Sequence, residues 1–397
     1  MHNREQNIGT LSKLLIFSAA AAVLCNYYYL YFIQFSEGAA EAGAGYSALK
    51  LCGILLVCIS LFSAKIKTSY KQEEVLLLIF FLLAITIFTF KSVIFSLSDI
   101  MFLNTAICII PLMLLSPKQP RYRINTFFES CLFIMTCQII IDFAIYFNNR
   151  SIWDNKAFIG GLGNPSSFGL VCNLLITYLL FYRPSKATSL LYFPTLVVGV
   201  YMTNSMLSLI ALMIIFGTWA TTNFSAKRLL AALIAISITA ALSSYLMSDH
   251  LAYKLQSAIN LFNDEAASDG SRSVSLRMQI HNEYITNFLN HPFDAVLYGF
   301  SESSYMKYDS QVLTYTSSFG LFCSALFFLF FTVALFKSHR NKMAFQTISL
   351  AIFGITLLTN RILDYYPIPI FLALILIMSR KEKTSELEVV PSLYMSR

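Results

Sequence analysis

The chain has 397 residues, of which 57% are hydrophobic, 15% are aromatic and only 12% are charged. Soluble proteins carry about 25% charged residues, so this composition excludes an ordinary soluble domain, a disordered chain and a nucleic-acid-binding module. The formal net charge of +7 could suggest an anionic partner, but in membrane proteins such an excess more often reflects basic cytoplasmic loops. The composition therefore predicts an all-α polytopic membrane protein.

Apolar segments recur along the whole chain. A helix needs about 20 mainly apolar residues to cross a bilayer, and about 12 segments satisfy this requirement. They are 11–34, 46–64, 74–92, 97–116, 126–147, 165–182, 188–203, 205–222, 229–247, 311–336, 344–360 and 366–380. The pair 188–203 and 205–222 could instead form a hairpin that dips in from the outer face. We interpret the first segment as a retained span and not as a cleaved signal peptide.

The basic residues predict the orientation. With the N-terminus in the cytoplasm, the inner segments carry 19 of the 28 lysines and arginines, as the positive-inside rule expects. The predicted organisation is nine spans with short loops over 1–247, one large periplasmic loop over 248–310, three spans over 311–380 and a cytoplasmic tail over 381–397. The basic residues left in outer segments or within spans are Lys50, Lys91, Arg150, Lys156, Lys254, Arg272, Arg277, Lys307 and Arg361.

Cysteines and histidines do not form a metal-binding pattern. All eight cysteines lie within apolar runs, whereas a disulfide framework or zinc site would need clustered ligands in a loop. The five histidines show no paired spacing. We therefore expect the cysteines to be small packing residues and expect no metal or cofactor.

The large outer loop contains two predicted helices. One covers about 250–262, and the other covers about 273–290 and ends before Pro292, which cannot continue it. In the second helix an apolar row (Leu276, Ile280, Tyr284 and Phe288) runs beside Arg277 and His281. This pattern is typical of a helix on the membrane surface that turns Arg277 towards a cavity, although a surface helix with one arginine is also commonplace.

Four arginines lie on the predicted outer side, where basic residues are depleted: Arg150, Arg272, Arg277 and Arg361. Guanidinium groups stay charged and bind phosphates through paired hydrogen bonds. We therefore expect a cavity that holds a lipid-linked diphosphate. Asp142, inside the fifth predicted span, could serve that cavity or could pair with Lys50.

Several short motifs follow one another in a recognisable order. The segment Phe158-Ile-Gly-Gly-Leu-Gly-Asn164-Pro165 opens a span after an outer loop, and the turn Thr203-Asn204-Ser205 joins two spans. In the large loop, Ser271-Arg272 and Arg277 are followed by His291-Pro292 and Tyr298-Gly299-Phe300, and then by Tyr308-Asp309-Ser310 before the next span. Over residues 150–335 this succession resembles the O-antigen polymerase and O-antigen ligase superfamily.

The resemblance implies a membrane-embedded GT-C-like glycosyltransferase in the bacterial inner membrane that acts at its periplasmic face on undecaprenyl-diphosphate-linked glycans. Ligases of that family characteristically carry His-Asn where this chain has Asp309-Ser310, which favours a polymerase. The turn at Asn204-Ser205-Met206 lacks an arginine often found there, and Arg361 could take its place. The implied partners are a chain-length regulator and a flippase of the same pathway, with no nucleic acid.

The polymerase reaction assigns roles to individual residues. Arg272, Arg277 and Arg361 would stabilise the leaving diphosphate without a metal, and Arg150 would guide the glycan. Asp309 is the candidate general base, with Glu283 and His281 behind it, although Asp309 could equally be a helix N-cap. Asn164, His281 and Asp142 are further candidates for substrate binding. Inversion at the anomeric carbon is expected. The alternatives are an O-antigen ligase, a capsule or exopolysaccharide polymerase, and a lipid-linked oligosaccharide flippase.

Overall fold

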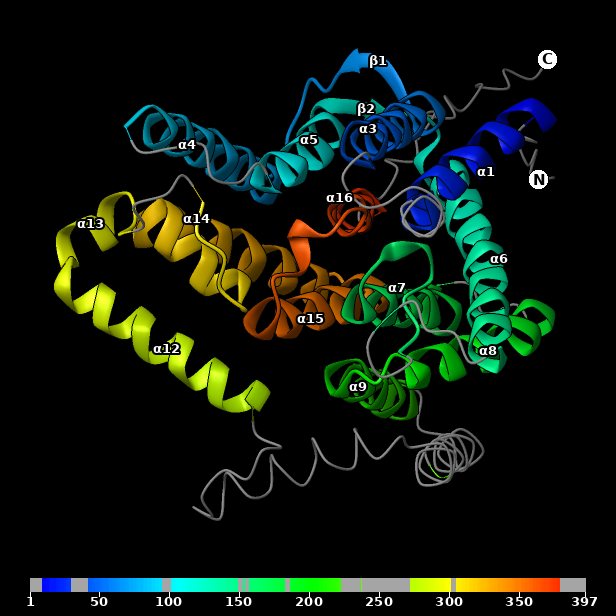
Figure 1. Ribbon diagram of the computed structural model, residues 1–397. Coiled ribbons are helices and arrows are strands. Elements are labelled where there is room, and N and C mark those ends of the chain that lie inside the picture. The colour runs from blue at the N-terminus through cyan, green and yellow to red at the C-terminus, as the bar shows by residue number, and fades with distance from the viewer. Residues whose placement is uncertain are drawn as a thin grey trace, which may run out of the picture.

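A computed structural model describes residues 9–29, 42–94, 101–148, 153, 157–182, 186–222, 237, 272–300 and 305–378. Helices dominate these residues (Figure 1). They are α1 (Thr10–Leu24), α3 (Ala42–Leu61), α4 (Gln72–Ile94), α5 (Met101–Leu114), α6 (Pro120–Phe147), α7 (Pro165–Thr177), α8 (Lys186–Met202), α9 (Met206–Thr222), α12 (Arg272–Asn290), α13 (Pro292–Leu297), α14 (Gln311–Arg340), α15 (Ala344–Thr359) and α16 (Ile368–Met378). Short 3₁₀ turns cover Gly160–Leu162 and Ile362–Asp364, and a π-helical segment covers Tyr178–Tyr182.

Among the described residues, four helical stretches are long and apolar enough to cross a membrane: Gln72–Ile94, Tyr122–Phe147, Pro165–Tyr182 and Gln311–Arg340. The same part of the chain has seven shorter apolar helices in further segments that the sequence predicts as spans. The predicted span 229–247 lies outside the described residues, apart from residue 237. The all-α class is confirmed, and the four long helices indicate a multi-pass membrane protein.

Three of the predicted inner segments, around residues 65–71, 118–123 and 337–342, lie at one end of the helix bundle. Here β1 (Phe62–Ile66) pairs antiparallel with β2 (Leu115–Pro117), a small ribbon that the sequence analysis did not predict. The Lys337 ammonium lies 2.7 Å from the Glu73 carboxylate, and so joins the end of α14 to the start of α4. We call this the basic end, after its described lysines and arginines Lys65, Lys67, Lys71, Lys118, Arg123, Lys337, Arg340 and Lys342. Its location in the cytoplasm stays a prediction.

The opposite end, which we call the loop end, gathers the predicted outer segments. Thr105 of α5 donates a hydrogen bond to the carbonyl of Leu363, and Ser310 donates one to the carbonyl of Leu357 in α15. Lys91, near the end of α4, donates to the carbonyl of Gly299. These bonds connect residues more than 45 positions apart, so they fix the loop end as a packed assembly of several helix termini.

Aromatic side chains fill the core between the two ends. The Phe102 ring lies 4.5 Å from Phe319 of α14, and Phe80 of α4 lies 5.2 Å from Tyr315 (centroid distances). All eight cysteines are free thiols. Since four of these are fully buried in the core, their packing role is confirmed at those positions.

Helix α14 is broken at Gly320, where the backbone has φ 81° and ψ 163°. This conformation is open essentially only to glycine. The break brings Gly320 against the backbone of Leu297 and Tyr298 at the end of α13, while Gly299 meets the backbone of Ser317 in return. The close approach of these backbones fixes the α13 segment of the large loop directly on the first turns of α14.

Helix α12 confirms the predicted second loop helix, and Pro292 opens α13 after it. The predicted first loop helix, at 250–262, lies outside the described residues. Ile280, Tyr284 and Phe288 form the half-buried side of α12, whereas Ile285 and Leu289 are exposed. Tyr284 packs on Phe300 and Tyr308. Ile280, Tyr284 and Phe288 therefore face the protein, and the expectation that this helix lies on the membrane surface stays a prediction.

Candidate functional site

A buried carboxylate organises the loop end. Asp364 ends the 3₁₀ turn that follows α15, and its side chain is 1% exposed. Its Oδ1 accepts a hydrogen bond from the Tyr305 hydroxyl at 2.7 Å and one from Gln311 Nε2 at 3.3 Å. Gln311 Oε1 in turn accepts from the backbone N–H of Leu363. The first turn of α14 and the turn after α15 are therefore held together by one polar network.

Arg361 completes this network. Its Nε lies 2.8 Å from Asp364 Oδ2, and its side chain remains 17% exposed. Burial raises the pKa of Asp364 to about 6, while the Arg361 guanidinium and the hydrogen bonds from Tyr305 and Gln311 act against this shift. The guanidinium also carries N–H donors on its two terminal nitrogens. They can bind a second anion with two parallel hydrogen bonds.

A second cation lies close to this pair. Partial burial and the Arg361 charge lower the pKa of Lys307, and the Asp364 carboxylate acts in the opposite direction. Arg361 and Lys307 place two positive charges beside the Asp364 carboxylate. Such a pair of cations can contribute to binding an anionic ligand.

The segment 305–310 lies between this cluster and α12. Tyr308 packs against Tyr284 of α12 with a ring distance of 5.5 Å, and the Tyr284 hydroxyl lies 2.7 Å from Thr316 Oγ1. Burial raises the pKa of Tyr308, the Asn287 side chain lowers it, and the Glu283 carboxylate raises it further. Glu283 and Asn287 of α12 thus both lie close to Tyr308, the residue before Asp309.

Asp309 does not cap α14. The N-cap is Ser310, whose hydroxyl accepts the N–H of Val312 at 3.2 Å. The alternative role proposed for Asp309, as the N-cap, is therefore wrong. The structure places Asp309 half-buried, beside Tyr308 and two residues before Gln311, which begins α14 and belongs to the Asp364 network.

The structure gives less information on the other predicted arginines and on His281. Arg272 and Arg277 belong to α12 by their backbone, but their side chains lie outside the described residues. His281 is exposed on the same helix. Arg150 lies outside the described residues. The structure places Arg361 and Lys307 beside Asp364 at the loop end, and Glu283 of α12 close to Tyr308.

Asp142 holds a glycine-rich turn. Its Oδ2 accepts the backbone N–H groups of Ile159 at 3.1 Å and Gly160 at 2.8 Å, and its Oδ1 accepts the Tyr28 hydroxyl at 3.2 Å. One expected role of Asp142 was an ion pair with Lys50. The described partners of its carboxylate are instead two backbone amides and the Tyr28 hydroxyl. Its carboxylate therefore positions the turn.

Gln138, one helical turn before Asp142 on α6, supports the same loop. Its Oε1 accepts the N–H of Gly161 at 3.1 Å, and its Nε2 donates to the carbonyl of Leu24. Gly160 and Gly163 have φ values of 50° and 74°, a region that favours glycine. The glycines of the motif are thus required by the shape of this turn.

Asn164 caps α7, and Pro165 follows it in the first turn. Its Oδ1 accepts the backbone N–H groups of Ser166 at 2.9 Å and Ser167 at 3.2 Å. Ser166 also lines a narrow crevice with Thr356 of α15, which lies five residues before Arg361. The Asn-Pro motif therefore begins a helix whose N-terminus borders the loop end.

Sequence reasoning missed Asp364, Tyr305 and Gln311. Only the Arg361–Asp364 spacing, with opposite charges three residues apart between two spans, signals this cluster in the sequence. Compared with protein-family models, curated proteins and solved structures, the chain has no match.

Proposed function

We propose that the chain is a polysaccharide polymerase that joins undecaprenyl-diphosphate-linked oligosaccharide repeats at the periplasmic face of the inner membrane, as an O-antigen polymerase does. The observation that carries this proposal is the Arg361 guanidinium at the loop end, held through Nε by the buried Asp364. The sequence resemblance over 150–335 supplies the substrate class.

The reaction requires charge stabilisation more than a metal. As the acceptor sugar hydroxyl attacks the anomeric carbon, the bond to the diphosphate oxygen breaks and undecaprenyl diphosphate leaves with an added negative charge. Arg361 is held in place before the reaction, so it can stabilise that charge without reorganising. Lys307 adds a second positive charge, and Arg272 and Arg277 on α12 are the proposed further cations.

The proton of the acceptor hydroxyl needs a base. Asp309 is our candidate because of its place in the motif before the next span, and because Ser310, not Asp309, performs the capping role. Glu283 approaches the same segment from α12. Attack from the side opposite the diphosphate gives inversion at the anomeric carbon.

Lipopolysaccharide banding in a deletion strain tests the proposal. Loss of a polymerase leaves core carrying a single repeat, whereas loss of a ligase leaves core without any repeat. Complementation with Arg277→Ala or Asp309→Ala is expected to restore protein level but not the ladder. Arg340→Ala, an exposed arginine at the basic end, is the matched control and is expected to restore the ladder fully. A normal ladder with both site variants would contradict the proposed roles.

A further inference from the structure

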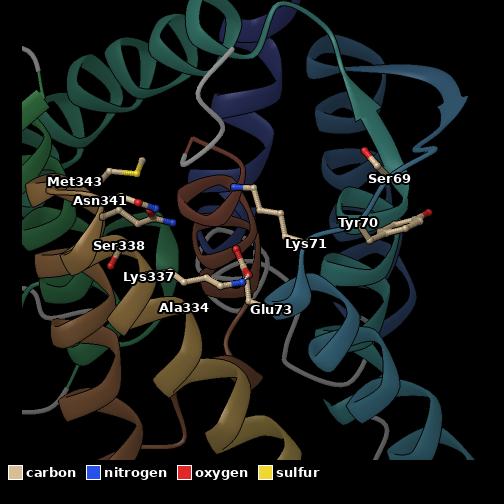
Figure 2. Close-up of a pocket in the computed structure, with 10 residues that line it drawn as sticks. Ser69, Tyr70, Lys71, Glu73, Ala334, Lys337, Ser338, Asn341 and Met343 are labelled. Atoms are coloured by element: carbon tan, nitrogen blue, oxygen red, sulfur yellow. Dashed lines mark hydrogen bonds and ion pairs between the residues drawn. The ribbon is translucent and has the colours of Figure 1, made fainter. Parts of the chain in front are cut away.

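A cavity of about 500 Å³ opens at the basic end, on the side of the molecule opposite the proposed active site. Its lining comes from the segment before α4 and from the junction of α14 and α15 (Figure 2). The lining residues are Ser69, Tyr70, Lys71, Glu73, Ala334, Lys337, Ser338, Asn341, Met343 and Gln346. The volume lies within the range of about 300–1,000 Å³ that is typical of small-ligand sites.

Two ammonium groups supply the positive charge of this cavity. Lys337 contacts Glu73 at 2.7 Å, but an ammonium has three N–H donors and can bridge to a second acceptor. Figure 2 shows the Lys71 side chain extending from the other wall towards Asn341. Glu73 is the one acid among the lining residues, so the lining has a net positive charge and fits a phosphate.

A buried acceptor gives the second observation. Gln346 is 4% exposed and lines the cavity. Its Nε2 donates to the carbonyl of Ile375 at 3.3 Å, while its Oε1 has no hydrogen-bond partner among the described residues. A buried acceptor without a donor destabilises the folded chain. A ligand hydroxyl in the cavity would satisfy it once the buried amide turns towards the cavity.

The position of the cavity indicates the source of the phosphate. Glu73 lies in the first turn of α4 and Lys337 in the last turn of α14, both membrane-span candidates. The lining therefore lies where a bilayer has its headgroups. Val75 and Phe336, at most two residues from lining residues, expose apolar side chains that acyl chains can cover.

We propose that this cavity binds the headgroup of an anionic phospholipid that combines a phosphodiester with free hydroxyls, as phosphatidylglycerol does. The phosphodiester pairs with Lys71 and Lys337, and a headgroup hydroxyl donates to Gln346 Oε1. Basic pockets between membrane helices bind anionic headgroups in this way. The site does not depend on the polymerase reaction, because its ligand is a lipid of the surrounding membrane.

Native mass spectrometry of the full chain tests the site with four probes: phosphatidylglycerol, phosphatidic acid, phosphatidylcholine and soluble glycerol phosphate. Phosphatidylglycerol should bind most tightly. One lysine near a membrane surface contributes about 1 kcal/mol, so Lys71→Gln should weaken its binding about fivefold. Gln346→Met should lower phosphatidylglycerol affinity to that for phosphatidic acid and leave phosphatidic acid binding unchanged.

The matched control is Lys65→Gln, which removes an exposed charge at the same end but outside the lining. It should leave the affinity for phosphatidylglycerol unchanged. An equal loss of affinity in Lys65→Gln and Lys71→Gln would show diffuse attraction to the charged surface and would contradict a specific site. Asn341→Asp, an exposed lining residue, gives a second variant if Lys71→Gln folds poorly, and it should weaken binding similarly. Equal affinity for soluble glycerol phosphate would overturn the lipid assignment.

Discussion

The Nε atom of Arg361 lies 2.8 Å from Oδ2 of Asp364. The second oxygen of that carboxylate is bound by Tyr305 and Gln311, so Asp364 is held from three sides. Two hydrogen bonds orient the Asp364 carboxylate, and the ion pair in turn orients the Arg361 guanidinium. This arrangement turns a flexible surface side chain into a fixed positive group.

Replacing both members of the pair should separate folding from activity. Removing Arg361 alone leaves a buried charge without a partner, which commonly costs about 3–5 kcal/mol. Arg361→Met with Asp364→Asn removes both charges and should keep the unfolding temperature near that of the wild type. Polymer formation should nevertheless fall about 100-fold, because a fixed charge at the leaving group is lost.

Arg361→Lys is the companion variant. It keeps the charge but has one ammonium for both Asp364 and the diphosphate, so it should have activity between the wild type and the double variant. The measurement is polymer yield from purified lipid-linked repeats. Wild-type yield in the double variant would remove Arg361 from the reaction.

The Asp364 carboxyl gives stability a defined pH dependence. Burial raises its pKa from 3.8 to about 6, so between these values the folded chain binds a proton that the unfolded chain has released. The resulting stabilisation is present below about pH 4 and is lost as the pH rises to 6. It amounts to about 3 kcal/mol.

Comparison with Asp364→Asn isolates this contribution, because the amide does not titrate. The unfolding temperature of the wild type, relative to that of the variant, should fall from pH 4 to pH 6 and stay level above it. A constant difference across this range would show that the Asp364 pKa is the same in both states.

Asp142→Ala should destabilise the glycine-rich turn. The substitution leaves the N–H groups of Ile159 and Gly160 without their acceptor, and buried unpaired groups cost about 1–3 kcal/mol each. We expect a loss of about 3 kcal/mol. Tyr28→Phe removes one hydrogen bond to the same carboxylate and should cost about 1 kcal/mol. Thermal unfolding in detergent measures both, and equal losses would contradict the backbone role of Asp142.

Gly320→Ala and Gly354→Ala are expected to change the stability of the folded chain in opposite directions. A Cβ at Gly320 would lie 2.7 Å from the backbone of Leu297 and Tyr298, at a φ of 81°, so the loss should be about 3 kcal/mol. A Cβ at Gly354, inside α15, would meet Phe331 at 3.6 Å and should stabilise by up to about 1 kcal/mol. Thermal unfolding of both variants checks the break in α14.

The helices were predictable because each carries its own signal. An apolar run identifies a span locally, and Pro292 marks the end of α12 without any tertiary information. The direction of the α12 apolar row was not predictable, because an apolar face fits a membrane surface and a protein surface equally well. Only the contacts of Tyr284 with Phe300 and Tyr308 decide between them.

The candidate site was predictable in part. The charge of Arg361 on the predicted outer side drew attention to it, but its setting depends on Tyr305 and Gln311, which lie 59 and 53 residues from Asp364 in sequence. The partners of Asp142 were not predictable for a related reason. Its partners are backbone N–H groups, and a sequence pattern does not show which amides a side chain will meet.

The glycine-rich turn before α7 has a consequence for how an anion can be recognised. Such a turn at a helix N-terminus usually offers its main-chain amides to a phosphate. Here the amides of Ile159, Gly160 and Gly161 are all taken by Asp142 and Gln138 of α6. Those of the first turn of α7 are taken by the Asn164 cap. These amides are therefore already hydrogen-bonded, and a diphosphate near this turn has to be recognised by other groups.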